Sequence, residues 1–263
     1  SGDRGKLESY MQHGELLAAK NGMMDPATIQ RLGFTPARTE VRRRLLCQVA
    51  APKGFGKTTF ALTGPEPIYY YKLETGDEGG VEPFAAAGRE IYTYRAYYNR
   101  ANWKEEWTKF LDSIAYTCLE MKDKPCTFVF DTMSEVYEFG RMAHFGGRLS
   151  QVVPREYGVI YADMREIIRN VEACGASGIF IQKMGPSFDN KAVLEVKGWD
   201  DIKWDMQVLL SLHRVDATPE YPGIRYIGRV DECRQNGRLV GTQLENGGQD
   251  PLNIEHLMRI VHG

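Results

Sequence analysis

Nine residues that follow the first apolar run of the chain decide the fold: Ala51-Pro52-Lys53-Gly54-Phe55-Gly56-Lys57-Thr58-Thr59. They fit the phosphate-binding loop spacing x-x-x-x-G-K-[ST], with Ala51 where the first glycine of that motif usually stands. Residues 45–50 predict a strand before the loop, and residues 58–62 predict the first turns of a helix after it. The alternative is a strand-to-helix turn that uses glycine by chance. Spacing and context together favour a phosphate-binding loop.

The residue types in the loop suit phosphate chemistry. Gly54 and Gly56 let backbone N–H groups close around phosphate oxygens, and the following helix adds its positive N-terminal end. Lys57 would reach the β- and γ-phosphates of a nucleotide, and the Thr58 hydroxyl would bind Mg²⁺. The predicted nucleotide-binding residues are Pro52, Lys53, Gly54, Phe55, Gly56, Lys57, Thr58 and Thr59.

Length and composition limit the class of protein. At ~150 residues per domain, 263 residues allow between one and two domains. Lysine and arginine number 33 against 35 acids, for a net charge of -2, which excludes a uniformly basic nucleic-acid-coating protein but not a local basic face.

No apolar stretch approaches the ~18 residues that span a bilayer, and the first residues lack the apolar core of a signal peptide. We expect a cytoplasmic protein with no membrane partner.

The cysteines and histidines form no metal-binding pattern. The five cysteines are odd in number, widely scattered and never in a C-x-x-C pair, so neither a disulfide framework nor a zinc cluster is indicated. The five histidines never pair four residues apart, as a metal-binding helix requires. We expect reduced, buried thiols and no metal site made of histidine and cysteine.

Three parts follow one another along the chain. Residues 1–40 show helical spacing and predict a helical arm, in which Asp25 caps a second short helix that begins at Pro26. In residues 41–215, short apolar strands alternate with helices, which predicts an α/β core with a mostly parallel sheet and helices on both faces. Residues 216–263 predict a β-rich extension with an antiparallel hairpin.

The predicted core consists of short strands separated by longer helices. The predicted strands are residues 45–50, 67–73, 90–98, 127–130, 178–181 and 208–212, and the predicted helices are residues 102–121 and 156–174.

Two acids at the ends of apolar runs would complete a hydrolytic site. Asp131 lies about seventy residues beyond the loop, the usual distance for an acid that supports Mg²⁺. Its alternative role is to cap a helix that begins near Ser134. Glu74 follows a predicted strand at its carboxyl end, where ligands bind in open α/β sheets, and would orient and deprotonate the attacking water. Its alternative is a solvated acidic loop, since two more acids follow closely.

Further polar residues have open roles. Gln182 and Lys183 end the predicted strand 178–181 and would sense the γ-phosphate, or else form a solvent-facing pair. A charge-stabilising cation, acting within the chain or on a neighbouring subunit, is expected among His213, Arg214, Arg225 and Arg229.

Three groups of residues are candidates for contact with DNA. The run Arg42-Arg43-Arg44 is more simply explained as a solvated face. Aromatic and basic residues between positions 92 and 100 would form a base-stacking surface, or pack on a sheet: Tyr92, Tyr94, Arg95, Tyr97, Tyr98 and Arg100. The loop-like segment 185–198, with the strand end before it, offers Lys183, Lys191 and Lys197.

Over residues 41–215 the chain resembles the RecA-type ATPase core, and within it the phage-encoded nucleotide-binding, single-strand-annealing ATPase group. The resemblance is carried, in order, by residues 54–59, Tyr71-Lys72-Leu73-Glu74, Phe128-Val129-Phe130-Asp131-Thr132-Met133-Ser134, Tyr157-Gly158 and Ile179-Phe180-Ile181-Gln182. Three features depart from the pattern: Ala51 in the loop, Lys72-Leu73 where an aspartate is common, and the N-terminal arm.

The resemblance implies a core that binds ATP and Mg²⁺ and assembles as a homo-oligomeric ring or filament. It also implies action on single-stranded DNA in phage recombination or replication, in the cytoplasm of the host cell. Carried over residue by residue, Lys57 and Thr58 are the phosphate and Mg²⁺ ligands and Asp131 is the metal-supporting acid. Glu74 is then the catalytic glutamate, and Gln182 the γ-phosphate sensor.

Three functions remain open on the sequence. The leading one is Mg²⁺-dependent hydrolysis of ATP to ADP and phosphate, coupled to DNA binding or assembly. A second is a non-hydrolytic switch, in which bound ATP orders an oligomer. A third is a small-molecule phosphotransferase with a mobile lid that carries Arg141, Arg148 and Arg155.

Overall fold

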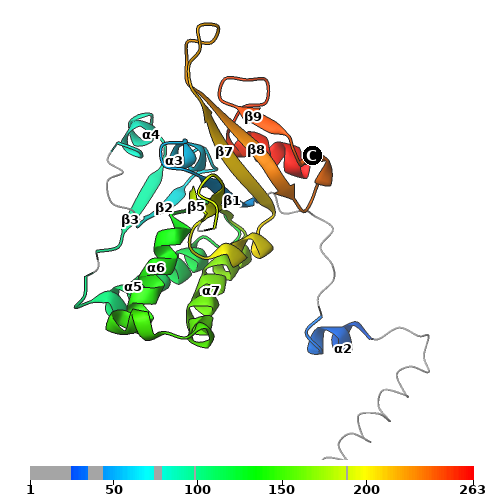
Figure 1. Cartoon of the computed structure of the whole chain (residues 1–263). Coiled ribbons are helices and arrows are strands. Elements are labelled where there is room, and N and C mark those ends of the chain that lie inside the picture. Colours follow the sequence, from blue (N-terminus) through cyan, green and yellow to red (C-terminus); the bar gives the residue numbers. More distant parts are fainter. Residues whose placement is uncertain (1–24, 35–43, 74–78, 98, 188) are drawn as a thin grey trace, which may run out of the picture. The chain divides into compact units, whose positions relative to one another are not determined.

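The computed structural model describes residues 25–34, 44–73, 79–97, 99–187 and 189–263 (Figure 1). The chain forms two compact units, residues 1–41 and 42–263. In the first unit, helix α2 spans Pro26–Arg31, and the Asp25 carboxylate accepts a hydrogen bond from the Thr28 N–H at 3.2 Å. The predicted cap and first helical residue are therefore confirmed. The expected earlier helix and the linker 35–38 lie outside the described residues.

The second unit alternates strands and helices over most of its length. Its strands are β1 (Leu46–Ala51), β2 (Ile68–Lys72), β3 (Ile91–Arg95), β4 (Thr127–Asp131), β5 (Ser177–Pro186), β6 (Leu194–Val196), β7 (Val208–Val215), β8 (Arg225–Cys233) and β9 (Gln243–Glu245). Its α-helices are α3 (Lys57–Ala61), α4 (Glu82–Ala86), α5 (Trp103–Glu120), α6 (Met133–Phe145), α7 (Gly158–Cys174) and α8 (Ile254–His262).

The strands form one mixed sheet in the order β3-β2-β4-β5-β1-β7-β8-β9, and β6 pairs with β5. Every neighbouring pair from β3 to β7 is parallel, whereas β8 and β9 add antiparallel strands at the far edge. The predicted α/β class with a mostly parallel sheet is therefore confirmed. Antiparallel pairing is present within residues 216–263, between β8 and β9. Because parallel strands end at the same edge, the carboxyl ends of β1, β2, β4 and β5 lie along one edge of the sheet.

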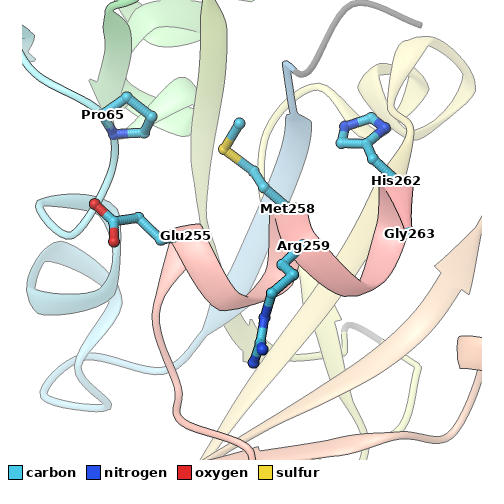
Figure 2. Close-up of a pocket in the computed structure, with 6 residues that line it drawn as sticks. All are labelled: Pro65, Glu255, Met258, Arg259, His262 and Gly263. Carbon is cyan, nitrogen blue, oxygen red and sulfur yellow. The ribbon is translucent and has the colours of Figure 1, made fainter.

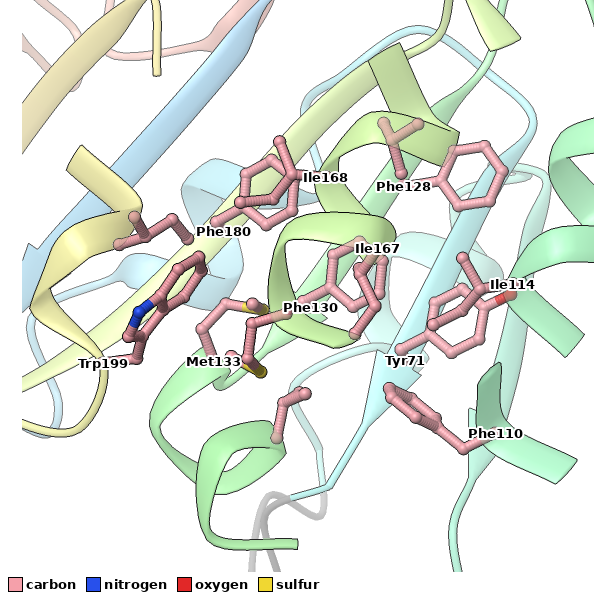
Figure 3. Packing of buried hydrophobic residues seen from close by; sticks show 14 of the residues in the cluster. Tyr71, Phe110, Ile114, Phe128, Phe130, Met133, Ile167, Ile168, Phe180 and Trp199 are labelled. Atoms are coloured by element: carbon pink, nitrogen blue, oxygen red, sulfur yellow. The ribbon is translucent and has the colours of Figure 1, made fainter. Parts of the chain in front are cut away.

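Alternation along the central strands divides the core between two faces. Phe128, Phe130 and Phe180 lie in a buried cluster with α5, α6 and α7, and the Phe130 and Phe180 rings stack at 5.3 Å (Figure 3). Val129 and Ile181, one residue away, lie in a second cluster with α3 and α8. Helices therefore cover both faces. Side chains alternate between the two faces along a strand. The parity of a residue, meaning whether it lies an even or an odd number of positions from these core residues, therefore decides which face its side chain reaches.

The last part of the chain differs from its expected β-rich character. Asn236-Gly237 predicts a turn before Arg238-Leu239-Val240, but residues 237–239 form a 3-10 helix, and α8 follows β9. Ile254, Leu257 and Val261 of α8 are buried at helical spacing in the second cluster. This helical pattern is short, so the sequence reasoning missed it.

All five cysteines are free and buried, which confirms the expected reduced thiols. Burial, with a smaller effect from Cys233, raises the pKa of the Cys47 thiol. A hydrogen bond with Cys174 and burial raise the pKa of Cys118 and Cys126. Protonated, buried thiols are poor nucleophiles, so these cysteines belong to the core.

Candidate nucleotide-binding site

The predicted phosphate loop joins β1 to α3 at the carboxyl edge of the sheet. Gly56 caps α3 with φ of 81°, a left-handed conformation that favours glycine. A Cβ atom built on Gly56 would also lie 3.3 Å from Cδ1 of Tyr226. The β7–β8 hairpin therefore brings an aromatic ring against the loop, a neighbour that the sequence reasoning missed.

Backbone carbonyls at the start of the loop hold the Lys57 side chain. Its Nζ donates hydrogen bonds to the carbonyls of Ala51 at 3.0 Å and Pro52 at 2.8 Å. The ammonium group therefore lies within the loop, where it is positioned to bind phosphate oxygens. Ala51, which replaces the usual first glycine, leaves this geometry intact.

Asp131 and Thr58 meet across the sheet as the motif requires. The Thr58 hydroxyl donates to Asp131 Oδ2 at 2.7 Å, and Asp131 is only 4 % exposed. The cap of α6 is Thr132, whose hydroxyl accepts from the Glu135 N–H at 3.3 Å. A hydroxyl and a carboxylate oxygen are hard donors that suit Mg²⁺. These two side chains therefore fit the predicted metal site.

Two residues of β2 that the sequence reasoning did not place in the site lie beside Asp131. The Tyr70 hydroxyl donates to Asp131 Oδ2 at 2.8 Å, and both residues are buried. Lys72 is 8 % exposed, pairs in register with Asp131, and shares the strand face of Tyr70 by alternation. The run Tyr69-Tyr70-Tyr71 has aromatic residues on both strand faces, so no sequence signal marked these two residues. The site therefore contains a buried lysine, Lys72, besides the half-buried Lys57 of the loop.

Glu82 of α4 carries a further negative charge near this lysine. Backbone N–H groups at the start of α4, above all its own, hold the pKa of Glu82 below its usual range, and Lys72 contributes less. Glu74, the predicted water-orienting acid, lies outside the described residues.

Gln182 ends up on the other face of the sheet from the loop. Its Oε1 accepts from the Ser134 hydroxyl at 2.8 Å, and its Nε2 donates to the Trp199 carbonyl at 3.1 Å. The side chain is fully buried, on the strand face of Phe180. Both the oxygen and the nitrogen of the Gln182 amide are therefore already hydrogen-bonded to protein groups. Its neighbour Lys183 has the opposite parity and forms an ion pair with Glu135.

The candidate cations of the β7–β8 hairpin have partners close to their own strands. The His213 ring lies 3.2 Å from the Ser211 hydroxyl, and the nearest acids to the arginines are Asp216 for Arg214, Glu245 for Arg225 and Asp231 for Arg229. None of these contacts joins the hairpin to the phosphate loop.

The candidate DNA-binding residues separate into packed and exposed groups. Tyr94 packs on Tyr71 and Phe110, with ring centroids 5.5 and 5.9 Å away, so it belongs to the sheet packing. Tyr92 and Tyr97 are 52 % and 74 % exposed. The remaining candidates have mixed surroundings. Arg44 pairs with Glu172 and Lys197 pairs with Glu195, whereas Arg95, Arg100 and Lys191 are exposed. Arg42, Arg43 and Tyr98 lie outside the described residues.

The three arginines of the predicted mobile lid lie on helices. Arg141 lies on α6, pairs with Glu138 at 2.6 Å and contacts the Tyr137 and Tyr157 rings. Arg148 and Arg155 lie in 3-10 helices that connect α6 to α7. These contacts hold Arg141 against the helical layer.

A cavity of about 430 Å³ lies beside α8 (Figure 2). Its lining residues are Pro65, Glu255, Met258, Arg259, His262 and Gly263. Pro65 precedes β2, and His262 bonds to the carbonyl of Arg44 just before β1, so this cavity lies at the amino edge of the sheet.

A close backbone approach ties the irregular segment that follows β6 to α6. Gly198 has φ of 95°, and a Cβ there would lie 3.0 Å from the Ser134 Cα. We expect Gly198→Ala to lower the free energy of unfolding by about 1–3 kcal/mol, as measured by urea denaturation. Gly237→Ala, at an open position, should change it by less than about 0.5 kcal/mol. If both variants unfolded at the same urea concentration, the close approach of Gly198 to Ser134 would be contradicted.

Neither a family model nor a curated protein matches this chain in sequence. Among solved structures, the chain is similar to the RadB recombinase, with 13% identity and a TM-score of 0.46, over 84% of this chain and 92% of that one. It is also similar to a DnaB-like replicative helicase, with 11% identity and a TM-score of 0.43, over 78% of this chain and 55% of that one. An ATPase of a type III secretion system matches at 14% identity and a TM-score of 0.44, over 87% and 70%.

Within the described parts of the chain, no helix has the length and apolar character needed to cross a membrane.

Proposed function

We propose that this protein is an ATPase that binds ATP and Mg²⁺ at the phosphate loop and hydrolyses ATP to ADP and phosphate. One observation carries the proposal: Thr58 bonds to the buried Asp131 at 2.7 Å beside a loop that already holds the Lys57 ammonium. These are the parts that P-loop NTPases use to bind nucleotide phosphates and metal.

Each side chain has a distinct task in this proposal. Lys57 binds β- and γ-phosphate oxygens, while Thr58 and Asp131 hold Mg²⁺, which when bound neutralises charge that develops on the phosphates. Glu74 orients a water molecule and accepts its proton. The water oxygen then forms a bond to the γ-phosphorus as the bond to the bridging oxygen breaks, and ADP leaves. Gln182 would sense the γ-phosphate through Ser134, because protein groups already bind its amide.

The resemblance to the phage single-strand-annealing ATPase group extends the proposal to assembly and DNA. We propose a homo-oligomeric ring or filament that acts on single-stranded DNA in the cytoplasm of a phage-infected cell. With a net charge of -2, any DNA contact depends on a local patch or on the assembled oligomer. The exposed Tyr92, Tyr97 and Lys191 are the supporting side chains.

Steady-state phosphate release, with and without single-stranded DNA, tests the hydrolytic proposal. Glu74→Gln should lower the rate by about 100-fold, because a catalytic base contributes about 10²–10⁴, while ATP binding persists. Glu105→Gln, at a 69 % exposed side chain of α5, is the matched control and should retain the rate. Absence of phosphate release, together with ATP-dependent oligomers on gel filtration, would favour the non-hydrolytic switch.

A further inference from the structure

The end of β5 places a lysine next to the phosphate loop. Lys183 pairs in register with Ala51, the first residue of the loop, whose carbonyl accepts from Lys57 Nζ. Strand β5 lies between β1 and β4, which carry the loop and Asp131. The backbone of Lys183 therefore lies between the phosphate loop, which would bind the phosphates, and Asp131, which would support the metal.

The parity of the strands directs this lysine to the loop face. Ile181 and Val129 belong to the cluster that contains α3, so Lys183 and Asp131, each two residues further along its strand, leave the sheet on that same face. Gln182 leaves on the opposite face. Of the two residues, Lys183 is therefore the one whose side chain starts on the face of the loop, and its ammonium extends to Glu135 in the first turn of α6.

An anionic partner holds the Lys183 ammonium. The ammonium pairs with the carboxylate of Glu135, which lies in the first turn of α6, four residues after Asp131. The two side chains are 32 % and 30 % exposed, so a ligand can reach the pair. A terminal phosphate and a carboxylate offer the same kind of anionic oxygen, and an ammonium group can bind either.

We propose that Lys183 binds the γ-phosphate and that Glu135 competes with this phosphate for the same ammonium group. This assignment rests on the proposed ATP site. ATP reaches the pair and ADP does not, so the exchange of partners distinguishes the two nucleotides. It also releases the Glu135 carboxylate at the start of α6 each time ATP binds.

Calorimetric titration of the full chain with adenylyl imidodiphosphate and with ADP, in MgCl₂, tests the assignment. Lys183→Gln should weaken binding of the triphosphate analogue about tenfold, the size of one charge-assisted hydrogen bond, and leave ADP within about twofold. Glu135→Gln should strengthen analogue binding about threefold, because the competing carboxylate is gone. Lys109→Gln, which removes a lysine from an ion pair on α5, is the matched control and should change neither affinity.

Equal losses for both nucleotides in Lys183→Gln, or an unchanged affinity for the analogue, would overturn the assignment of Lys183. Weaker analogue binding in Glu135→Gln would overturn the competition. A wild-type chain that binds neither nucleotide would instead overturn the proposed function itself.

Discussion

Lys57→Ala is expected to weaken ATP binding by about 100-fold or more. The lysine supplies charge-assisted hydrogen bonds to two phosphates, at about 1.5–3 kcal/mol each, and about 1.4 kcal/mol corresponds to tenfold in affinity. In the structure the same ammonium donates hydrogen bonds to the carbonyls of Ala51 and Pro52. Alanine removes the cation and leaves the glycine-containing backbone of the loop in place.

Isothermal titration with ATP in MgCl₂ measures this loss. Lys109→Ala removes a surface lysine from α5 and should retain the affinity of the unmodified chain. Circular dichroism of both variants checks that the fold is preserved. Unchanged ATP affinity in Lys57→Ala would mean that the loop is not the nucleotide site.

Asp131→Asn is expected to lower Mg²⁺-dependent phosphate release by about 10²–10³-fold. The substitution removes the negative charge that supports the metal but keeps an oxygen that can accept from Thr58 and Tyr70. Because the two side chains have nearly the same shape, the core around Asp131 should remain folded. ATP binding should persist more than turnover, since Lys57 and the loop are unchanged.

Phosphate release measured across a range of MgCl₂ concentrations distinguishes a metal defect from a structural one. Tyr70→Phe is the matched variant, because it removes one hydrogen bond to Asp131 and leaves the carboxylate. It should lower stability by about 1 kcal/mol and change the rate by less than about tenfold. If Asp131→Asn kept the Mg²⁺ response of the unmodified chain, Asp131 would not support the metal.

Local patterns in the sequence predicted much of the fold. The apolar runs at residues 45–50, 127–130 and 178–181 correspond to β1, β4 and β5, and the long helices α5 and α7 follow their apolar stripes. Helix α8 was missed because its pattern spans only residues 254–262. Strand ends were also misplaced: β5 continues to Pro186 beyond its apolar residues, whereas β3 is shorter than the predicted strand 90–98.

The candidate site, like the fold, was predicted only in part from the sequence. The loop, Thr58 and Asp131 were predicted from residue type, spacing and position at a strand end, and their contact appears in the structure. Tyr70 and Lys72 were not assigned to the site, because apolar or aromatic runs hide which face each side chain reaches. Gln182 was expected to face the nucleotide, yet parity turns its amide toward Ser134 and Trp199.

The phosphate loop is encoded by nine consecutive residues, because backbone conformation there depends on neighbouring glycines and on a lysine and threonine at fixed spacing. A sequence can therefore specify it without knowledge of the rest of the chain. The surroundings of the loop depend instead on register and parity between distant segments, as in Tyr70 against Asp131 and Tyr226 against Gly56. Those contacts, and the pairing of Lys183 with Glu135, exist only once the strands are aligned in one sheet.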